Sequence, residues 1–324
     1  MVSFFISYFL KYVVRLWLIA KVAKFIQKYM ANRYKLNSDF AQTVDTNRII
    51  DWNNITWFSY LARYAYKKDS EILDKYSNFD DIYINEIDQI KYFVLRDDTT
   101  KTYYVSVRGT TNSHNALQDI NFFKDKSFRL GIQLHTGFHR AAEVIADDLV
   151  YRLDKTYAIK VTGHSLGAAV GLIVAWYLDY SGYIVDECIT FGQPKVTDTA
   201  GARTMRGKIK LTRVVNETDI VSLVPPAGSH AKKYSHLGDM IKLLDDGHYC
   251  YLTEPDSLNF GVNSFWLYAA RESLSFYELG KELPDHYMDS YHENLNMIIN
   301  NPKEVQWIER LKYIKDGGIL GEWK

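Results

Sequence analysis

The stretch YAIKVTGHSLGAAVGLIVAWYL, residues 157–178, decides the fold expected for this chain. Residues 157–162 have the pattern of a short buried strand, and residues 168–178 that of an apolar helix. Between them stands G-x-S-x-G, the sequence of a sharp strand-to-helix turn with a serine at its tip. Glycines are needed there because a Cβ would collide with the strand or the helix. Ser165 is therefore expected to expose its hydroxyl at the start of the helix, where it can act as a nucleophile.

A second signal lies earlier in the chain, where β-forming residues 103–107 run directly into residues 108–110, Arg-Gly-Thr. A serine that attacks a carbonyl group creates an oxyanion, and two hydrogen-bond donors must be aimed at that oxygen. The backbone N–H of Leu166, the residue after Ser165, is one candidate donor. Thr110 is the other, through its backbone N–H and its hydroxyl. Together they form the expected oxyanion hole.

These segments and several others resemble, in the same order, the class 3 lipase (fungal-lipase-like) family of α/β-hydrolases. The matching segments are residues 59–66, 108–110, 115–119, 135–138, 163–167, 190–195, 216–221, 225–226, 234–238 and 285–286. The resemblance covers the chain from about residue 55 to about residue 295. It implies an α/β-hydrolase fold, with a mostly parallel central sheet flanked by helices. Helix-like and strand-like segments alternate between about residues 90 and 225, which agrees with parallel strands joined by helices.

The chemistry of such a serine needs a histidine to take its proton and a carboxylate to orient that histidine. In α/β-hydrolases the chain order is Ser, then Asp or Glu, then His. Asp219 follows a predicted strand and matches the acid of the family. His286 follows Leu-Pro-Asp, opens an amphipathic helix and matches the catalytic histidine of the family. His248, in a predicted turn between two strands, and His292 stay open as alternatives.

Metal and cofactor chemistry are not expected. His135 and His139 are four residues apart, but no third ligand has comparable spacing, which favours structural roles for both. The two cysteines, Cys188 and Cys250, fall in predicted buried strands, so a disulfide scaffold is not indicated. At 324 residues, one large α/β domain is expected.

The charge distribution is uneven, although the formal net charge is zero. Residues 1–38 hold seven of the 39 basic residues and none of the 39 acidic ones, and an apolar face lies opposite the charges on a helical wheel. This pattern predicts a basic amphipathic helix at a membrane interface. Charges interrupt every window long enough to span a bilayer, and they follow rather than precede the apolar run, unlike a signal peptide. A helix packed along the core is the alternative.

The expected organisation is a membrane-interface segment (1–38), a hydrolase domain (39–300) and a C-terminal extension (301–324). The expected location is peripheral on a membrane and cytoplasmic, with export by a route independent of a signal peptide left open. No nucleic-acid partner is expected. By the resemblance, a lid falls within residues 111–134, with Ala116 where the family often has tryptophan.

The predicted function is cleavage of carboxylic esters of lipids, as a lipase or phospholipase A1, through an acyl-serine intermediate. Ser165 attacks, His286 acts as base and then acid, and Asp219 orients the histidine. A small-ester or thioester hydrolase is one alternative. A catalytically inactive, membrane-bound interaction module is another.

Overall fold

The structure, a computed structural model, describes residues 44–45, 47–110, 123–217, 219, 221–225, 234–254 and 284–314. The predicted helix in residues 1–38 lies outside the described residues, as do residues 111–122 of the predicted lid. The division of the chain at residues 38/39 and 300/301 stays a prediction.

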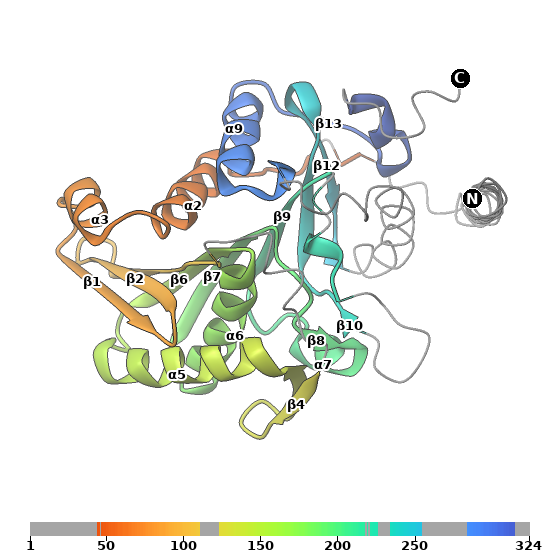
Figure 1. Ribbon diagram of the computed structural model, residues 1–324. Helices are drawn as coiled ribbons and strands as arrows, with labels where there is room; N and C mark the ends of the chain where they lie inside the picture. The colour runs from red at the N-terminus through yellow and green to blue at the C-terminus, as the bar shows by residue number, and fades with distance from the viewer. Residues whose placement is uncertain are drawn as a thin grey trace, which may run out of the picture.

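The main sheet has nine strands among the described residues, in the order β1-β2-β3-β6-β7-β9-β11-β12-β13 (Figure 1). The strands are β1 (Asp81–Ile87), β2 (Ile90–Asp97), β3 (Thr102–Val107), β6 (Ala158–His164), β7 (Ile184–Phe191), β9 (Leu211–Asn216), β11 (Asp239–Leu243), β12 (His248–Leu252) and β13 (Lys303–Glu304). The five neighbours β3, β6, β7, β9 and β11 all pair in parallel. The pairs β1–β2, β2–β3 and β11–β12 are antiparallel. The centre of the sheet is therefore parallel, as the sequence predicts.

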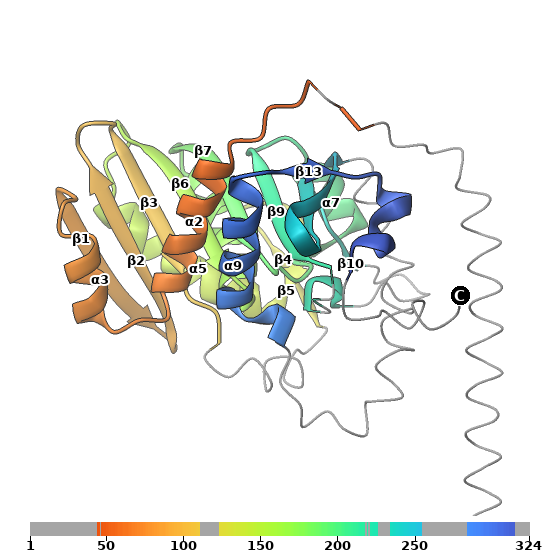
Figure 2. The same cartoon turned by 90° about the horizontal axis from the view of Figure 1, so that it is seen from above.

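Helices cover both faces of this sheet (Figures 1 and 2). On one face lie α5 (Thr136–Arg152) and α6 (Leu166–Tyr180), which pack with the central strands into the largest core cluster. On the other face α2 (Trp52–Tyr64) and α9 (Met288–Ile299) lie side by side and form a second core cluster with β7, β9 and β11. Helices thus cover both faces of the main sheet. The central strands are apolar on both faces because neither face meets solvent.

The helix after the G-x-S-x-G turn is buried on almost every side. Twelve of its fifteen residues, Gly167 to Leu178, are buried, which explains why it is apolar throughout rather than amphipathic. Burying a large apolar side chain such as Ile173 contributes about 1.5–3 kcal/mol to stability. The predicted strand and helix are both confirmed, at Ala158–His164 and Leu166–Tyr180. This burial holds the turn between them in place.

A second, four-stranded sheet lies beside the main one, in the order β10-β8-β5-β4. Its strands are β4 (Lys124–Ser127), β5 (Ile132–His135), β8 (Thr197–Asp198) and β10 (Tyr234–Ser235). The described part of the predicted lid region therefore forms an antiparallel hairpin, β4–β5.

The remaining short elements are α3 (Asp69–Lys75), α7 (Thr199–Met205) and the 3-10 turns η1 (Val221–Leu223), η2 (Asp245–Gly247), η4 (Pro284–His286) and η5 (Trp307–Tyr313). Cys188 in β7 and Cys250 in β12 are both buried and free, as expected for cysteines in core strands. Within the described part of the chain, no helix has both the length and the apolar character to cross a membrane.

Candidate active site

Ser165 sits in a strained turn between β6 and α6. Its backbone has φ 58° and ψ −128°, a conformation that side-chain-bearing residues rarely adopt. A Cβ on Gly163 would lie 2.6 Å from the carbonyl carbon of Gly167, and one on Gly167 would lie 2.5 Å from that of Arg108. Both flanking glycines are therefore required, as the sequence predicts. The backbone N–H of Ser165 donates to Phe191 O at 3.0 Å and anchors the turn to β7.

The expectation that the Ser165 hydroxyl is exposed is wrong, since the residue is only 3% exposed. The ring of His286 lies against it on one side. On another, the chain at Gly109 comes so close that a Cβ there would be 3.2 Å from the serine Cβ. The serine is at the tip of its turn, but neighbouring loops cover that tip. Burial strengthens every electrostatic interaction made by the hydroxyl.

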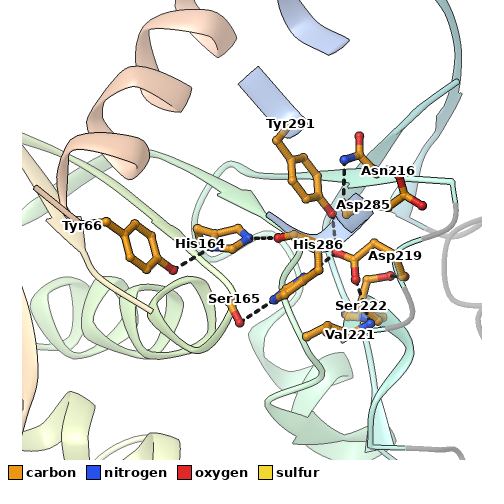
Figure 3. Close-up of polar contacts among 11 residues, drawn as sticks. Tyr66, His164, Ser165, Asn216, Asp219, Val221, Ser222, Asp285, His286 and Tyr291 are labelled. Carbon is orange, nitrogen blue, oxygen red and sulfur yellow. Dashed lines mark hydrogen bonds and ion pairs between the residues drawn. The ribbon is translucent and has the colours of Figure 1, made fainter. Parts of the chain in front are cut away.

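The structure brings Ser165, His286 and Asp219 together in one hydrogen-bonded chain (Figure 3). His286 Nε2 is 2.7 Å from Ser165 Oγ, and His286 Nδ1 is 2.9 Å from Asp219 Oδ2. All three side chains are buried. Ser165 comes from the β6–α6 turn, Asp219 from the segment after β9 and His286 from η4, so three distant parts of the chain meet at one point. This is the geometry that activates a serine hydroxyl.

Asp219 is held as an ion by its surroundings. Burial alone would raise its pKa, but the neighbouring His286 and hydrogen bonds from His286, Tyr291 and Val221 outweigh burial and lower the pKa. Tyr291 O–H donates to Oδ2 at 2.5 Å, and the Val221 N–H donates to Oδ1 at 2.8 Å. The carboxylate is therefore charged and oriented toward His286.

Two asparagine side chains place the turn that carries the histidine. Asn216 Nδ2 donates to Asp285 O at 2.8 Å, and Asn294 Nδ2 donates to Asn216 Oδ1 at 2.9 Å. These bonds tie the His286 turn both to the end of β9 and to α9. The prediction that His286 opens the following helix is wrong. His286 is the last residue of η4, and α9 begins at Met288.

The other histidines have different surroundings. His248 Nδ1 lies 2.9 Å from Asp245 O in the turn between β11 and β12, and His292 Nδ1 lies 2.8 Å from Ser59 Oγ between α9 and α2. Among the described histidines, His286 alone contacts Ser165 through its ring. The nitrogen atoms of His139 lie 2.6 Å from Asp125 Oδ1 and 2.7 Å from Tyr177 Oη, and His135 accepts from the Phe138 N–H at the start of α5. Within the residues described, no group of three potential ligands could hold a metal ion.

Of the two predicted oxyanion donors, Leu166 follows Ser165 in the chain, and Thr110 follows a strand end that lies against Ser165 in space. Leu166 is the first residue of α6, where backbone N–H groups have no acceptor within the helix. Thr110 is half-buried and follows Gly109, which packs against Ser165. Their donation to an oxyanion stays a prediction.

Sequence reasoning missed three supporting residues (Figure 3). Tyr291 donates to the carboxylate of Asp219, and its place on the first turns of the helix after His286 was the available signal. His164 Nε2 contacts His286 O at 2.6 Å, and Tyr66 Oη lies 2.7 Å from His164 Nδ1. Both residues lie inside segments quoted for the family resemblance, yet their side chains had no assigned role.

A strained serine turn at the end of a parallel strand, with an acid and a histidine following in chain order, defines an α/β-hydrolase with a serine-hydrolase site. Sequence comparison agrees. The sequence model described as "Lipase (class 3)" matches residues 104–229. The chain is 32% identical over 165 residues to a lipase of Rhizomucor miehei, which covers 47% of this chain and 45% of that protein. It is 33% identical over 142 residues to secreted mono- and diacylglycerol lipase 1 of Fusarium solani, with 41% and 42% covered.

Solved structures show the same fold. A triacylglycerol lipase described as having a serine protease triad superposes with a TM-score of 0.52 and 26% identity, over 60% of this chain and 80% of that one. Lipase II from Rhizopus niveus superposes with a TM-score of 0.54 and 23% identity, over 74% and 94%. Over the matched residues 104–229 the chain is thus similar to the class 3 lipases, and the relatives named above are fungal lipases. It spans somewhat less than half the length of the curated relatives that it matches.

Proposed function

We propose that this protein is a serine hydrolase that cleaves the carboxylic esters of acylglycerols. The observation that carries the proposal is the buried chain from Ser165 Oγ through His286 to Asp219, with contacts of 2.7 and 2.9 Å. The likeness to lipases of Rhizomucor miehei and Fusarium solani supports acylglycerols as the substrate class.

In the proposed reaction, His286 Nε2 removes the proton of Ser165 as Oγ bonds to the ester carbonyl carbon. The Leu166 N–H and Thr110 stabilise the resulting oxyanion. Protonated His286 then gives its proton to the departing alcohol, which leaves an acyl-serine. A water molecule attacks this acyl group with His286 again as base, and the carboxylic acid is released. Asp219 keeps the proton on Nδ1, so that Nε2 is the atom that accepts.

The basic, apolar segment 1–38 supports a further part of the proposal, peripheral attachment to an anionic membrane surface. An acylglycerol substrate collects at such a surface. A phospholipase A1 activity would use the same chemistry on a different lipid, so phospholipids belong in the substrate test.

The test combines a substrate panel with a serine-directed probe. The panel contains mono-, di- and triacylglycerols, phospholipids and short nitrophenyl esters, and the probe is a fluorophosphonate. Wild-type protein should take up the probe and hydrolyse acylglycerols. Ser165→Ala should lose labelling and at least ~10³-fold in kcat.

Two histidine variants serve as a matched pair. His286→Ala should match the serine variant, and combining the two changes should cost little more than either alone, because triad members act as one unit. His248→Ala should retain activity. A wild-type protein that neither reacts with the probe nor cleaves any ester, or inactivation by His248→Ala with His286→Ala active, would overturn the proposal.

A further inference from the structure

A line of hydrogen bonds lies beside the serine turn, and Figure 3 shows its part from Tyr66 through His164 to His286. It runs from the backbone of Gly109, beside the predicted oxyanion residue Thr110, to the hydroxyl of Tyr66. The hydroxyl contacts His164 Nδ1 at 2.7 Å, and His164 Nε2 contacts His286 O at 2.6 Å. The side chains of the proposed triad make none of these contacts; His286 takes part through its backbone carbonyl only.

The direction of every bond in this line follows from its ends. The carbonyl of His286 can only accept, so His164 Nε2 carries the proton and donates. Nδ1 of the same neutral ring is then an acceptor, so Tyr66 must donate its O–H to it. The Tyr66 oxygen accepts from the Gly109 N–H, which can only donate. One arrangement of protons satisfies all three bonds.

Burial keeps both side chains neutral. His164 is 4% exposed, and its burial, together with the neighbouring His286, lowers the pKa of His164 to about 3. Burial likewise raises the pKa of Tyr66. Neutrality matters because the ring centroids of His164 and His286 are 4.7 Å apart. A charged His164 would oppose the imidazolium that His286 must become in the proposed reaction.

Glycine at position 109 allows the strand end to approach the Tyr66 hydroxyl. A Cβ there would collide with the Tyr66 hydroxyl and lie 2.6 Å from His164 O. The Arg-Gly-Thr strand end can therefore approach Tyr66, His164 and Ser165 only because residue 109 has no side chain.

We infer that Tyr66 and His164 are positioning residues that hold the oxyanion strand end, at Gly109 and Thr110, in fixed register with the backbone of His286. The inference rests on the proposed function. In the proposed reaction the oxyanion donors bind the carbonyl oxygen of the substrate, while His286 takes the proton of the hydroxyl that attacks the same carbonyl group. The strand end and His286 must therefore keep a fixed position relative to each other. Small misplacements of such groups cost large factors in rate.

The kinetic test uses Tyr66→Phe, with the active fraction counted by fluorophosphonate titration so that unfolded protein is not scored. Loss of the hydroxyl should lower kcat about tenfold and leave KM within about twofold, because alignment rather than substrate binding is lost. Tyr92→Phe is the matched control. Tyr92 is buried, and its hydroxyl donates at 2.5 Å to Asp148, away from the site, so its loss should leave kcat unchanged.

Two His164 variants test the hydrogen bond from His164 to the backbone carbonyl of His286. His164→Gln keeps an amide N–H that can donate to His286 O, whereas His164→Leu removes all donors. The glutamine should therefore recover at least about tenfold of the kcat that the leucine loses. Tyr66→Phe should cost much less in the His164→Leu background than alone, because leucine leaves the Tyr66 hydroxyl without its acceptor. Equal kcat for Tyr66→Phe and wild type, or equal cost in both backgrounds, would overturn the inference.

A spectroscopic measurement keeps this inference separate from the proposed function. Imidazole nitrogen-15 shifts should show His164 as the neutral Nε2–H tautomer from about pH 4 to pH 9, with His164→Gln assigning the signal. Tyr66→Phe should perturb that tautomer. An Nδ1–H tautomer of His164, or protonation of its ring near pH 6, would refute the inferred line of hydrogen bonds, even in a protein with no esterase activity. A protein with the expected tautomer but no esterase activity would instead refute the proposed function and, with it, the positioning role.

Discussion

Replacing Asp219 by asparagine tests whether this carboxylate acts by charge and orientation rather than by volume. Asp219 is 2% exposed, and its two oxygens accept three donors. Oδ2 receives His286 Nδ1–H and the Tyr291 O–H, while Oδ1 receives the Val221 N–H. An asparagine of the same shape has one acceptor oxygen and one donor nitrogen, so it cannot satisfy this set in either orientation.

Each orientation has a defined cost. With the amide nitrogen toward Val221, two donors face each other and a buried N–H loses its acceptor, which costs about 1–3 kcal/mol of stability. With the nitrogen toward His286, the ring must carry its proton on Nε2, the atom that has to accept from Ser165. The second orientation stops general-base catalysis, and a loss of about 10⁴ in kcat is the expected scale for a histidine held in the wrong tautomer.

The assay is kcat on a soluble short-chain ester, with KM measured in parallel and folding checked by thermal unfolding. KM should change little. A kcat within tenfold of wild type would refute the assigned role of Asp219. Acidic pH offers a second reading: because the folded-state pKa of Asp219 is lowered from 3.8, its stabilisation is complete above that value and is lost as pH falls below it. The stability difference between wild type and Asp219→Asn should therefore shrink below about pH 4.

Three other changes have defined outcomes. Gly192→Ala should reduce kcat by about 10² or more in steady-state assays, because a Cβ at φ 57° would lie 2.8 Å from Asp219 Oδ2 and 3.1 Å from His286 Cε1; wild-type kinetics would contradict this. Glu217→Gln should lower the free energy of unfolding in urea by about 3 kcal/mol, since the buried Lys242 and Arg310 both pair with that carboxylate at 3.4 and 3.2 Å; a loss under ~1 kcal/mol would argue against it. Deleting residues 1–35 should abolish sedimentation with anionic liposomes and spare the turnover of soluble esters, because each basic group near the surface contributes roughly 1 kcal/mol of salt-sensitive binding free energy. Equal binding by both forms would refute the membrane role, and loss of all activity would favour a helix packed on the core.

Local pattern determined much of this protein. The buried strand, the two glycines and the apolar helix around Ser165 predict a nucleophile turn, because steric limits on a tight turn act within a few residues. The order of Ser165, Asp219 and His286 along the chain, seen beside the family resemblance, indicated the three residues that the structure brings together. The alternation of strands and helices predicted the parallel centre of the sheet.

Tertiary structure alone decided what surrounds those residues. From the sequence, Ser165 was expected to be exposed, yet loops from Gly109 and His286 bury it. The choice of His286 over His248 became a matter of distance only when η4 was seen to lie against the serine turn. The hydroxyl of Tyr66 and the ring of His164 have no local signature, because their partners lie 98 and 122 residues away in the chain. Such contacts depend on how distant segments pack, and no window of neighbouring residues contains that information.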